Sequence, residues 1–256
     1  MPDVFESPKL AHPYVRVHND ALSLHFENEC IQSLMSCQNP DGLEIPYTRT
    51  MMVFLLAKPI PDHILMIGLG GGSLAKFCYK NLPNTRITVV EINPDVIALR
   101  NLFKVPDDDE RFRVVLADGA DFVRSAKTNF DVILVDGFDE KGQSAQLTTR
   151  EFYEDCYRLL QSKGILVANL DNAHPAHMLF LRRALKTFKN SAVELQVPER
   201  SNSILFASKN VPITSRWMSL SWTLNEHTSD AKHQLKDEFQ RILGILDTLE
   251  ALTNLS

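Results

Sequence analysis

The sequence predicts an α/β fold with a doubly wound, mostly parallel sheet of the Rossmann-like type. Five short apolar segments alternate with helix-compatible stretches between residues 64 and 170. Strands that alternate with helices at this spacing indicate parallel strands covered by helices on both faces. The first apolar segment, residues 64–67, also runs directly into a glycine-rich turn. Ligands of such sheets bind at the carboxyl ends of the strands, so we expect the functional residues there.

The glycine-rich turn lies between this first segment and helix-compatible residues at 74–81. It holds four glycines within five positions, namely Gly68, Gly70, Gly71 and Gly72. Glycine has no Cβ, so the backbone can approach a ligand closely, and the start of the following helix offers unpaired N–H groups. A tight strand-to-helix connection without any ligand would use the same residues. The turn alone therefore leaves both interpretations open.

Acidic residues follow the next two predicted strands. Glu91 ends the segment 87–91, where a carboxylate can accept hydrogen bonds from both hydroxyls of a ribose. Asp118 follows the segment 112–116, where it is placed to accept a hydrogen bond from the exocyclic amine of a purine. Together with the glycine-rich turn, these acids favour a site for a nucleoside-containing ligand.

The other expected elements lie on both sides of this core. Loose alternation of apolar and polar residues predicts small antiparallel strands at 14–18, 22–26 and 31–35. Further strands are expected at 132–135, 165–169, 193–197 and 203–207, and helices at 47–57, 149–160 and 177–188. We therefore expect a small N-terminal β region (1–45), a Rossmann-like catalytic domain (46–215) and a C-terminal helical tail (216–256).

The tail contains a stripe of apolar residues at helical spacing between Leu235 and Leu252. This stripe predicts a helix over 230–253. Such a helix packs either on the surface of its own chain or against a partner, including a second copy of the chain in a homodimer. The sequence leaves both possibilities open.

The composition limits the classes of partner. The 256-residue chain has a formal net charge of −5, so it has no basic excess to hold a nucleic acid, whereas a small cationic substrate would suit it. No apolar run is long enough to span a membrane, and no targeting segment is found, so a cytoplasmic protein is expected. The cysteines and histidines lack metal-ligand spacing, so no metal is expected.

Two carboxylates follow the fourth strand of the predicted sheet. Asp136 and Asp139 lie in the run Val-Asp-Gly-Phe-Asp, next to the site that the glycine-rich turn predicts. A carboxylate there can bind an amine or take its proton as a general base. Alternatively, Asp136 caps a turn and Asp139 is solvated.

Four ordered segments carry a resemblance to a known family. They are Ile-Gly-Leu-Gly-Gly-Gly-Ser-Leu (67–74), Val-Val-Glu-Ile-Asn-Pro (89–94), Ala-Asp-Gly-Ala-Asp-Phe (117–122) and Asp-Val-Ile-Leu-Val-Asp-Gly-Phe-Asp (131–139). Over about residues 31–170 the chain resembles spermidine synthase-like aminopropyltransferases, within the class I S-adenosylmethionine-dependent methyltransferase superfamily. The resemblance implies that superfamily's sheet, and a nucleoside donor and an amine acceptor as small-molecule partners.

The resemblance also implies a role for each matching residue. Those that bind the donor would be Gly68, Gly70, Gly72, Glu91, Asp118 and Gly119, with Gly71 in the same turn. Asp136 matches the catalytic aspartate. Those that bind the acceptor would be Asp139, Tyr47 and Gln32.

The chain also departs from the family's motifs. Gly71 stands where the family has an aspartate that pairs with the amine of decarboxylated S-adenosylmethionine. After the second aspartate, Glu140 and Lys141 break the family's Asp-Pro-x-Gly-Pro pattern, and Gln143 replaces its second proline. A late segment with a substrate-contacting tyrosine is not found between 195 and 206.

Three functions remain open at this stage. The first is aminopropyl transfer to an amine in polyamine biosynthesis, favoured by the two aspartates. The second is methyl transfer from intact S-adenosylmethionine to a small molecule or a protein, favoured by Gly71. The third is a nucleoside-binding module without turnover. In the first two cases the donor is a co-substrate, and no tightly bound cofactor is expected.

Overall fold

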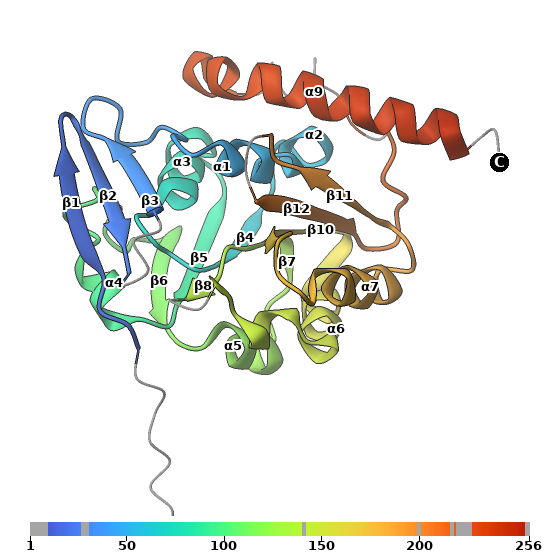
Figure 1. The fold of residues 1–256 in the computed structure, drawn as a ribbon, viewed down its shortest axis with the longest axis horizontal. Helices are drawn as coiled ribbons and strands as arrows, with labels where there is room; N and C mark the ends of the chain where they lie inside the picture. The colour runs from blue at the N-terminus through green and yellow to red at the C-terminus, as the bar shows by residue number, and fades with distance from the viewer. Residues whose placement is uncertain are drawn as a thin grey trace, which may run out of the picture.

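The computed structural model describes residues 10–26, 31–139, 142–198, 201–215, 218 and 227–253. Seven strands form its central sheet (Figure 1). In spatial order they are β11 (Ala192–Gln196), β12 (Asn202–Ser208), β10 (Leu160–Asp171), β7 (Phe130–Val135), β4 (His63–Ile67), β5 (Arg86–Glu91) and β6 (Phe112–Leu116). The strands from β10 to β6 are parallel, and β12 runs antiparallel to both β10 and β11. The predicted doubly wound, mostly parallel sheet is confirmed.

Helices cover both faces of this sheet, because its strands are apolar on both sides. Along β4, Ile64 and Met66 pack in one core cluster, whereas Leu65 and Ile67 pack in the other. The first face carries α1 (Pro46–Met51), α2 (Phe54–Ala57), α3 (Ser73–Asn81) and α4 (Pro94–Ala98). The second face carries α5 (Gly119–Ser125), α6 (Arg150–Leu159) and α7 (His177–Thr187). The result is a three-layer arrangement (Figure 1).

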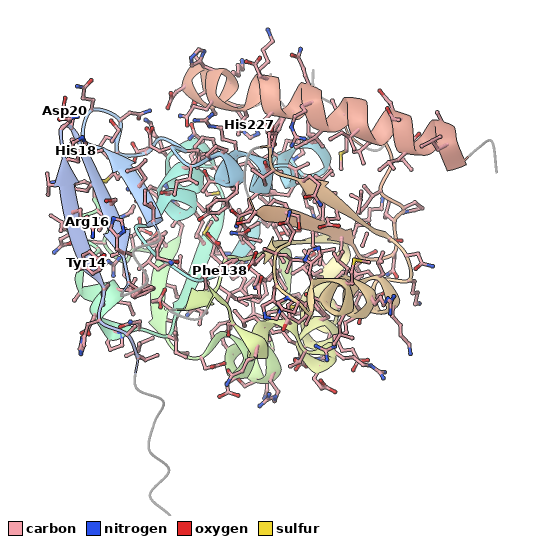
Figure 2. All side chains as sticks on the ribbon, viewed as in Figure 1. Tyr14, Arg16, His18, Asp20, Phe138 and His227 are labelled. Atoms are coloured by element: carbon pink, nitrogen blue, oxygen red, sulfur yellow. The ribbon has the colours of Figure 1, made fainter. Side chains whose placement is uncertain are left out.

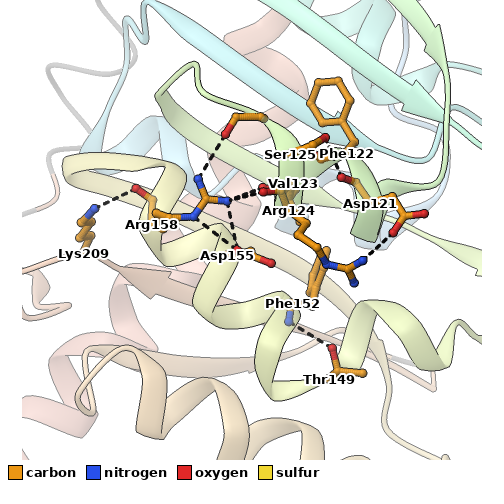
Figure 3. Close-up of polar contacts among 11 residues, drawn as sticks. Asp121, Phe122, Val123, Arg124, Ser125, Thr149, Phe152, Asp155, Arg158 and Lys209 are labelled. Carbon is orange, nitrogen blue, oxygen red and sulfur yellow. Dashed lines mark hydrogen bonds and ion pairs between the residues drawn. The ribbon is translucent and has the colours of Figure 1, made fainter.

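Arg158 joins two helices of the second face. Its guanidinium, on α6, donates to the backbone carbonyl oxygens of Val123 (2.7 Å), Arg124 (3.1 Å) and Ala126 (3.2 Å), at the end of α5 (Figure 3). These carbonyls lack partners inside their own helix, so the side chain supplies them. The contact stabilises α5, whose first residues lie at the edge of the sheet where ligands are expected.

A separate three-stranded antiparallel sheet precedes the central one. It consists of β1 (Tyr14–His18), β2 (Ala21–His25) and β3 (Ile31–Ser36), with β2 in the middle. Figure 2 labels Tyr14, Arg16 and His18 on its outer strand. At the inner strand, β3, the Ser33 hydroxyl lies 3.4 Å from that of Ser73, at the start of α3. The small sheet therefore packs over the glycine-rich turn.

The C-terminal stripe packs on the chain's own fold. Helix α9 (Ser229–Thr253) buries Leu235, Phe239, Ile242 and Leu246 in the core cluster that includes α1 and α2. Its Glu238 carboxylate accepts a hydrogen bond from the Thr50 hydroxyl of α1. Leu252, near its end, has an exposed fraction of 60%. Within the described residues, none of the helices is long and apolar enough to cross a membrane.

Two expected elements differ in their extent. The helix expected at 47–57 is divided into α1 and α2, because the N–H groups of Met52 and Val53 bond three residues back and tighten the chain. The strand expected at 165–169 is longer at both ends, because β10 pairs with β7 from Leu160 and with β12 as far as Asp171. These extra residues bring Asp171 to the edge of the sheet.

Candidate functional site

A cavity of about 750 Å³ opens at the carboxyl ends of the central strands. It is lined by eight of the predicted site residues, namely Gln32, Tyr47, Gly68, Gly70, Glu91, Asp118, Gly119 and Asp136. Phe138, labelled near the centre of Figure 2, also lines it. Gly71 and Gly72, although they belong to the same turn, do not line the cavity. Asp139 belongs to the short strand β8 (Phe138–Asp139), but its side chain lies outside the described residues, as do Glu140 and Lys141.

Gly68 allows two strand ends to approach each other. Its φ is +98°, and a Cβ at this position would lie 2.2 Å from the backbone carbonyl oxygen of Asp136. The Asp136 N–H donates to the carbonyl of Ile67 at 2.8 Å. A side chain at position 68 would therefore push Asp136 away from the edge of β4.

Gly71 is enclosed by its neighbours. A Cβ at this position would lie 2.6 Å from the Ser33 Oγ and 2.8 Å from the Cδ1 of Phe103. Both of these side chains are buried, with exposed fractions of 6% and 1%. The volume that an aspartate would need at position 71 is therefore occupied by a serine from the N-terminal sheet and by an aromatic ring.

Glu91 is tied to the glycine-rich turn by its own carboxylate. Its Oε2 accepts a hydrogen bond from the Leu69 N–H, and its Oε1 accepts one from the Asn93 N–H, both at 2.8 Å. Burial raises the pKa of Glu91, and these backbone hydrogen bonds oppose that rise. The residue also lines the cavity, so its position is compatible with contacts to ribose hydroxyls.

Asp118 caps helix α5 and faces the same cavity. Its Oδ1 accepts hydrogen bonds from the N–H groups of Ala120 (2.7 Å) and Asp121 (3.1 Å). Asn93 caps α4 in the same manner, with its side-chain oxygen 2.9 Å from the Asp95 N–H. These two caps fix the loops that follow β5 and β6. Asp118, which was expected at the nucleoside site, therefore lies at the start of a helix that it caps itself.

Asp136 is held by a chain of hydrogen bonds. The Tyr47 hydroxyl donates to its Oδ2, and the Asn169 amide donates to its Oδ1, both at 2.9 Å. Asn202 in turn donates to the Asn169 side-chain oxygen at 3.0 Å. The carboxylate is oriented from two sides, by α1 and by β10, and it faces the cavity.

Burial shifts the pKa of this carboxyl group. It raises the pKa of Asp136, and the hydrogen bonds from Asn169 and Tyr47 oppose the rise. Burial and the nearby Asp136 charge raise the pKa of Tyr47 well above its ordinary value, so its hydroxyl keeps its proton and remains a donor. A carboxylate whose pKa is raised accepts a proton more readily than an ordinary aspartate, which suits a general base.

The cavity is acidic. Among its described lining residues are four carboxylates, Glu91, Asp118, Asp136 and Asp171, and no lysine, arginine or histidine. A wall of one sign raises the local concentration of ligands of the opposite charge. The cavity therefore favours cationic groups such as ammonium and sulfonium.

Among the polar lining residues that sequence reasoning missed are Asn169, Asp171 and Asn202. One signal was present, because Asn169 and Asp171 interrupt the apolar run that begins at Ile165, two positions apart. Residues at this spacing point to the same face of a strand. Their position at the carboxyl end of a buried strand marked them as candidates for the site.

Comparison with solved structures identifies the class of fold. A probable spermidine synthase from Corynebacterium glutamicum aligns with a TM-score of 0.68 and 23% identity, over 85% of this chain and 87% of that one. Human methyltransferase-like protein 13 aligns with a TM-score of 0.56 and 21% identity, over 78% of this chain and 92% of that one. The fold is therefore the Rossmann-like fold that spermidine synthases share with methyltransferases.

Comparison of sequences identifies the family within this class. The profile of the spermine/spermidine synthase domain matches residues 44–206. The chain is also 41% identical over 199 residues to the polyamine aminopropyltransferase of Chromobacterium violaceum, which covers 77% of this chain and 76% of that protein. The chain belongs to the spermine/spermidine synthase family.

Proposed function

We propose that the protein is an aminopropyltransferase that uses decarboxylated S-adenosylmethionine as donor and a polyamine-type amine as acceptor. The observation that carries this proposal is Asp136, a buried carboxylate oriented by Tyr47 and Asn169 at the edge of an acidic cavity. Both substrates are cations, and the cavity suits them. The similarity to polyamine aminopropyltransferases supports the same reaction.

The proposed step is a single displacement at carbon. The lone pair of a neutral amine nitrogen attacks the donor's methylene carbon next to the sulfonium. The new C–N bond forms as the C–S bond breaks. The electron pair of the C–S bond goes to sulfur, which becomes a neutral thioether. The nitrogen then loses a proton to Asp136. Positioning of the two reactants accounts for most of the rate in such a step.

The other site residues have proposed binding roles. The backbone at Gly68 and Gly70 approaches the donor, Glu91 holds its ribose, and Asp118 with Gly119 meets its adenine. Gly71 and Gly72 allow the turn its shape, through a φ of +71° at Gly72 and the close packing of Ser33 and Phe103 on Gly71. Gln32, Tyr47 and Asp139 are proposed to contact the acceptor. We also propose the division into residues 1–45, 46–215 and 216–256, of which 216–217 and 219–226 lie outside the described residues.

A product assay with a variant of Asp136 tests this function. The wild-type protein, given decarboxylated S-adenosylmethionine and 1,4-diaminobutane, should form the aminopropylated amine and 5′-methylthioadenosine, both detected by mass spectrometry. Asp136→Asn should lower the turnover number by about 10²- to 10⁴-fold, because the positioned base is lost. Donor binding should remain nearly unchanged.

The matched control is Asp107→Asn, which removes the charge of an exposed aspartate outside the cavity and should leave turnover unchanged. If Asp136→Asn abolished donor binding and left the rate per bound donor unchanged, Asp136 would be a binding residue. A wild-type protein that binds the nucleoside but turns over no amine would favour a module without catalysis.

A second candidate function is methyl transfer from intact S-adenosylmethionine. One observation favours it, because Ser33 and Phe103 occupy the space of the aspartate that would pair with the amine of the decarboxylated donor. The turn offers N–H donors that suit the carboxylate of the intact donor. Methylated products in the same mass-spectrometric assay would support this candidate.

A further inference from the structure

The segment of residues 10–12, called the N-terminal segment below, reaches the cavity from the side of α4. Leu10 lines the cavity together with Glu91 and Ile92. Ala11 packs against the core cluster on the first face of the sheet. Figure 1 shows this part of the chain beside α4, just before it enters β1. The cavity therefore receives the Glu91 carboxylate from the central sheet and an apolar side chain from the N-terminal segment.

Asn93 fastens the N-terminal segment by its side chain. The side-chain amide of Asn93 donates to the backbone carbonyl oxygen of Ala11 at 2.8 Å, across 82 positions of sequence. The oxygen of the same side chain accepts from the Asp95 N–H at 2.9 Å, which caps α4. Asn93 is buried, with an exposed fraction of 5%. One buried side chain thus connects the N-terminal segment to the start of α4.

The backbone of Asn93 connects the same residue to Glu91. Its N–H donates to the Glu91 Oε1 at 2.8 Å, while the Leu69 N–H donates to Oε2 at the same distance. Buried hydrogen bonds of this kind fix the relative positions of the groups that they join. Asn93 therefore contacts both the carboxylate that is proposed to hold the ribose and the segment that carries Leu10.

The N-terminal segment has one further polar contact with a described residue. The Nδ1 of His12 lies 2.7 Å from the Asp95 carboxylate, and the exposed fractions of these side chains are 83% and 49%. Exposed pairs of this kind contribute little to stability. Few buried contacts hold the N-terminal segment, so it can open locally at a low free-energy cost and admit a ligand.

We propose that Asn93 is a positioning residue that holds the N-terminal segment over the nucleoside when the donor is bound. This inference rests on the proposed function, which assigns the ribose to Glu91. Leu10 excludes water from that end of the cavity, and hydrogen bonds to a carboxylate are stronger where water is excluded. The bound nucleoside in turn gives Leu10 a surface to pack on. Ligand binding and closure of the segment therefore favour each other.

Hydrogen exchange, measured by mass spectrometry on the full chain, tests the closure of the segment. In the wild-type protein, saturating 5′-methylthioadenosine should slow the exchange of the N–H groups of residues 10–12 by about ten- to hundredfold. Asn93→Ser should lose most of this protection. Serine is also a good N-cap residue, so this variant keeps the cap of α4 but removes the amide that donates to Ala11. The matched control is Asn101→Ser, at an exposed asparagine outside this cavity, which should keep the full protection.

Titration calorimetry with the same nucleoside tests whether Asn93 acts through Leu10. Asn93→Ser and Leu10→Ala should each weaken binding by about three- to tenfold. The double variant should bind no more weakly than Asn93→Ser, because a released segment no longer brings Leu10 to the ligand. A residue that only stabilises the fold would give additive losses. Leu102→Ala, at a leucine that is 46% exposed and lies outside this cavity, should leave the affinity unchanged.

Thermal unfolding without ligand should show that all of these variants are folded. The proposal would be overturned by additive losses in the double variant, or by a wild-type segment that the nucleoside does not protect. The product assay measures the proposed function separately. Turnover without protection of the segment would overturn the role of Asn93 alone, whereas a protein that binds no 5′-methylthioadenosine would overturn the proposed function and this role together.

Discussion

Asp136 combines two properties at the scale of a single residue. Burial raises its pKa above the usual value of an aspartate, and two hydrogen-bond donors fix its orientation. The hydrogen bonds from Tyr47 and Asn169 also stabilise the charged form of the carboxylate, so they limit the rise in its pKa. Removing one of these two hydrogen bonds therefore changes both the orientation and the pKa of the Asp136 carboxylate.

Tyr47→Phe is the variant that separates these effects. Without the hydroxyl, the charged carboxylate of Asp136 loses a hydrogen bond, so its pKa rises further. A general base works only when deprotonated, so activity is lost as the pH falls through this pKa. We expect the acid limb of the pH profile of kcat/KM to move to higher pH by about one pH unit. The measurement is the rate over a pH series for both proteins, and an unmoved acid limb would contradict the expectation.

Gly71→Asp tests the steric account of the missing aspartate. The new side chain would collide with Ser33 and Phe103, so we expect it to destabilise the fold by about 1–3 kcal/mol through overpacking. Urea unfolding measures the change. Gly142→Ala is a control with open space at the Cβ but a φ of +104°, so it reports backbone strain without overpacking. An unchanged stability of Gly71→Asp would show that the neighbours move aside easily.

The residues of the site differ in how far the sequence predicted them. Glu91 and Asp136 follow directly from acidic residues at strand ends, because parallel strands align their carboxyl ends at one edge. Asn202 could not be assigned, because its contact with Asn169 depends on the antiparallel register of β12 against β10. β10 and β12 are not consecutive strands, so no turn between them fixes this register, and the residues around position 202 do not reveal it.

At the scale of elements, α1 connects the site to the C-terminal helix. Tyr47 of α1 donates to Asp136, and Thr50, three residues later on the same helix, donates to Glu238 of α9. The stripe on α9 was predicted as a helix, but only the structure shows that it packs on this short helix. The division of the expected helix at Met52 was likewise not predictable, because its apolar residues show no break.

Leu235→Ala and Leu252→Ala form a matched pair on α9. Leu235 is buried, with an exposed fraction of 1%, whereas that of Leu252 is 60%. We expect Leu235→Ala to lower the free energy of unfolding by about 2–5 kcal/mol, because it leaves a cavity in the core. Leu252→Ala should change it by about 0.5 kcal/mol or less. Equal effects in chemical denaturation would show that the inner face of α9 contributes little to stability.

At the scale of the whole molecule, the acidic cavity and the enclosed Gly71 have opposite effects on the affinity for decarboxylated S-adenosylmethionine. The carboxylates favour a cation, but the aspartate that would bind the donor's amine is missing from the turn. Burying an ammonium without its partner is costly. The preference between the two donors therefore depends on whether another acid of the cavity reaches the amine.

Calorimetry with decarboxylated and intact S-adenosylmethionine decides between these effects. We expect the intact donor to bind at least comparably well, because the turn offers N–H groups to its carboxylate. A hundredfold preference for the decarboxylated donor, about 2.7 kcal/mol, would show that another acid replaces the missing aspartate. The nucleoside product 5′-methylthioadenosine, which lacks both groups, serves as the reference ligand.

The contact between α1 and α9 also orders events during synthesis on the ribosome. Translation produces α1 early, whereas α9 follows all the other described elements in the chain. A domain of a nascent chain generally folds as a unit. Helix α1, which carries Tyr47, therefore lacks the helix that covers it until α9, the last described element, has been synthesised. The Tyr47–Asp136 hydrogen bond consequently rests on a helix whose packing is completed only at the end of translation.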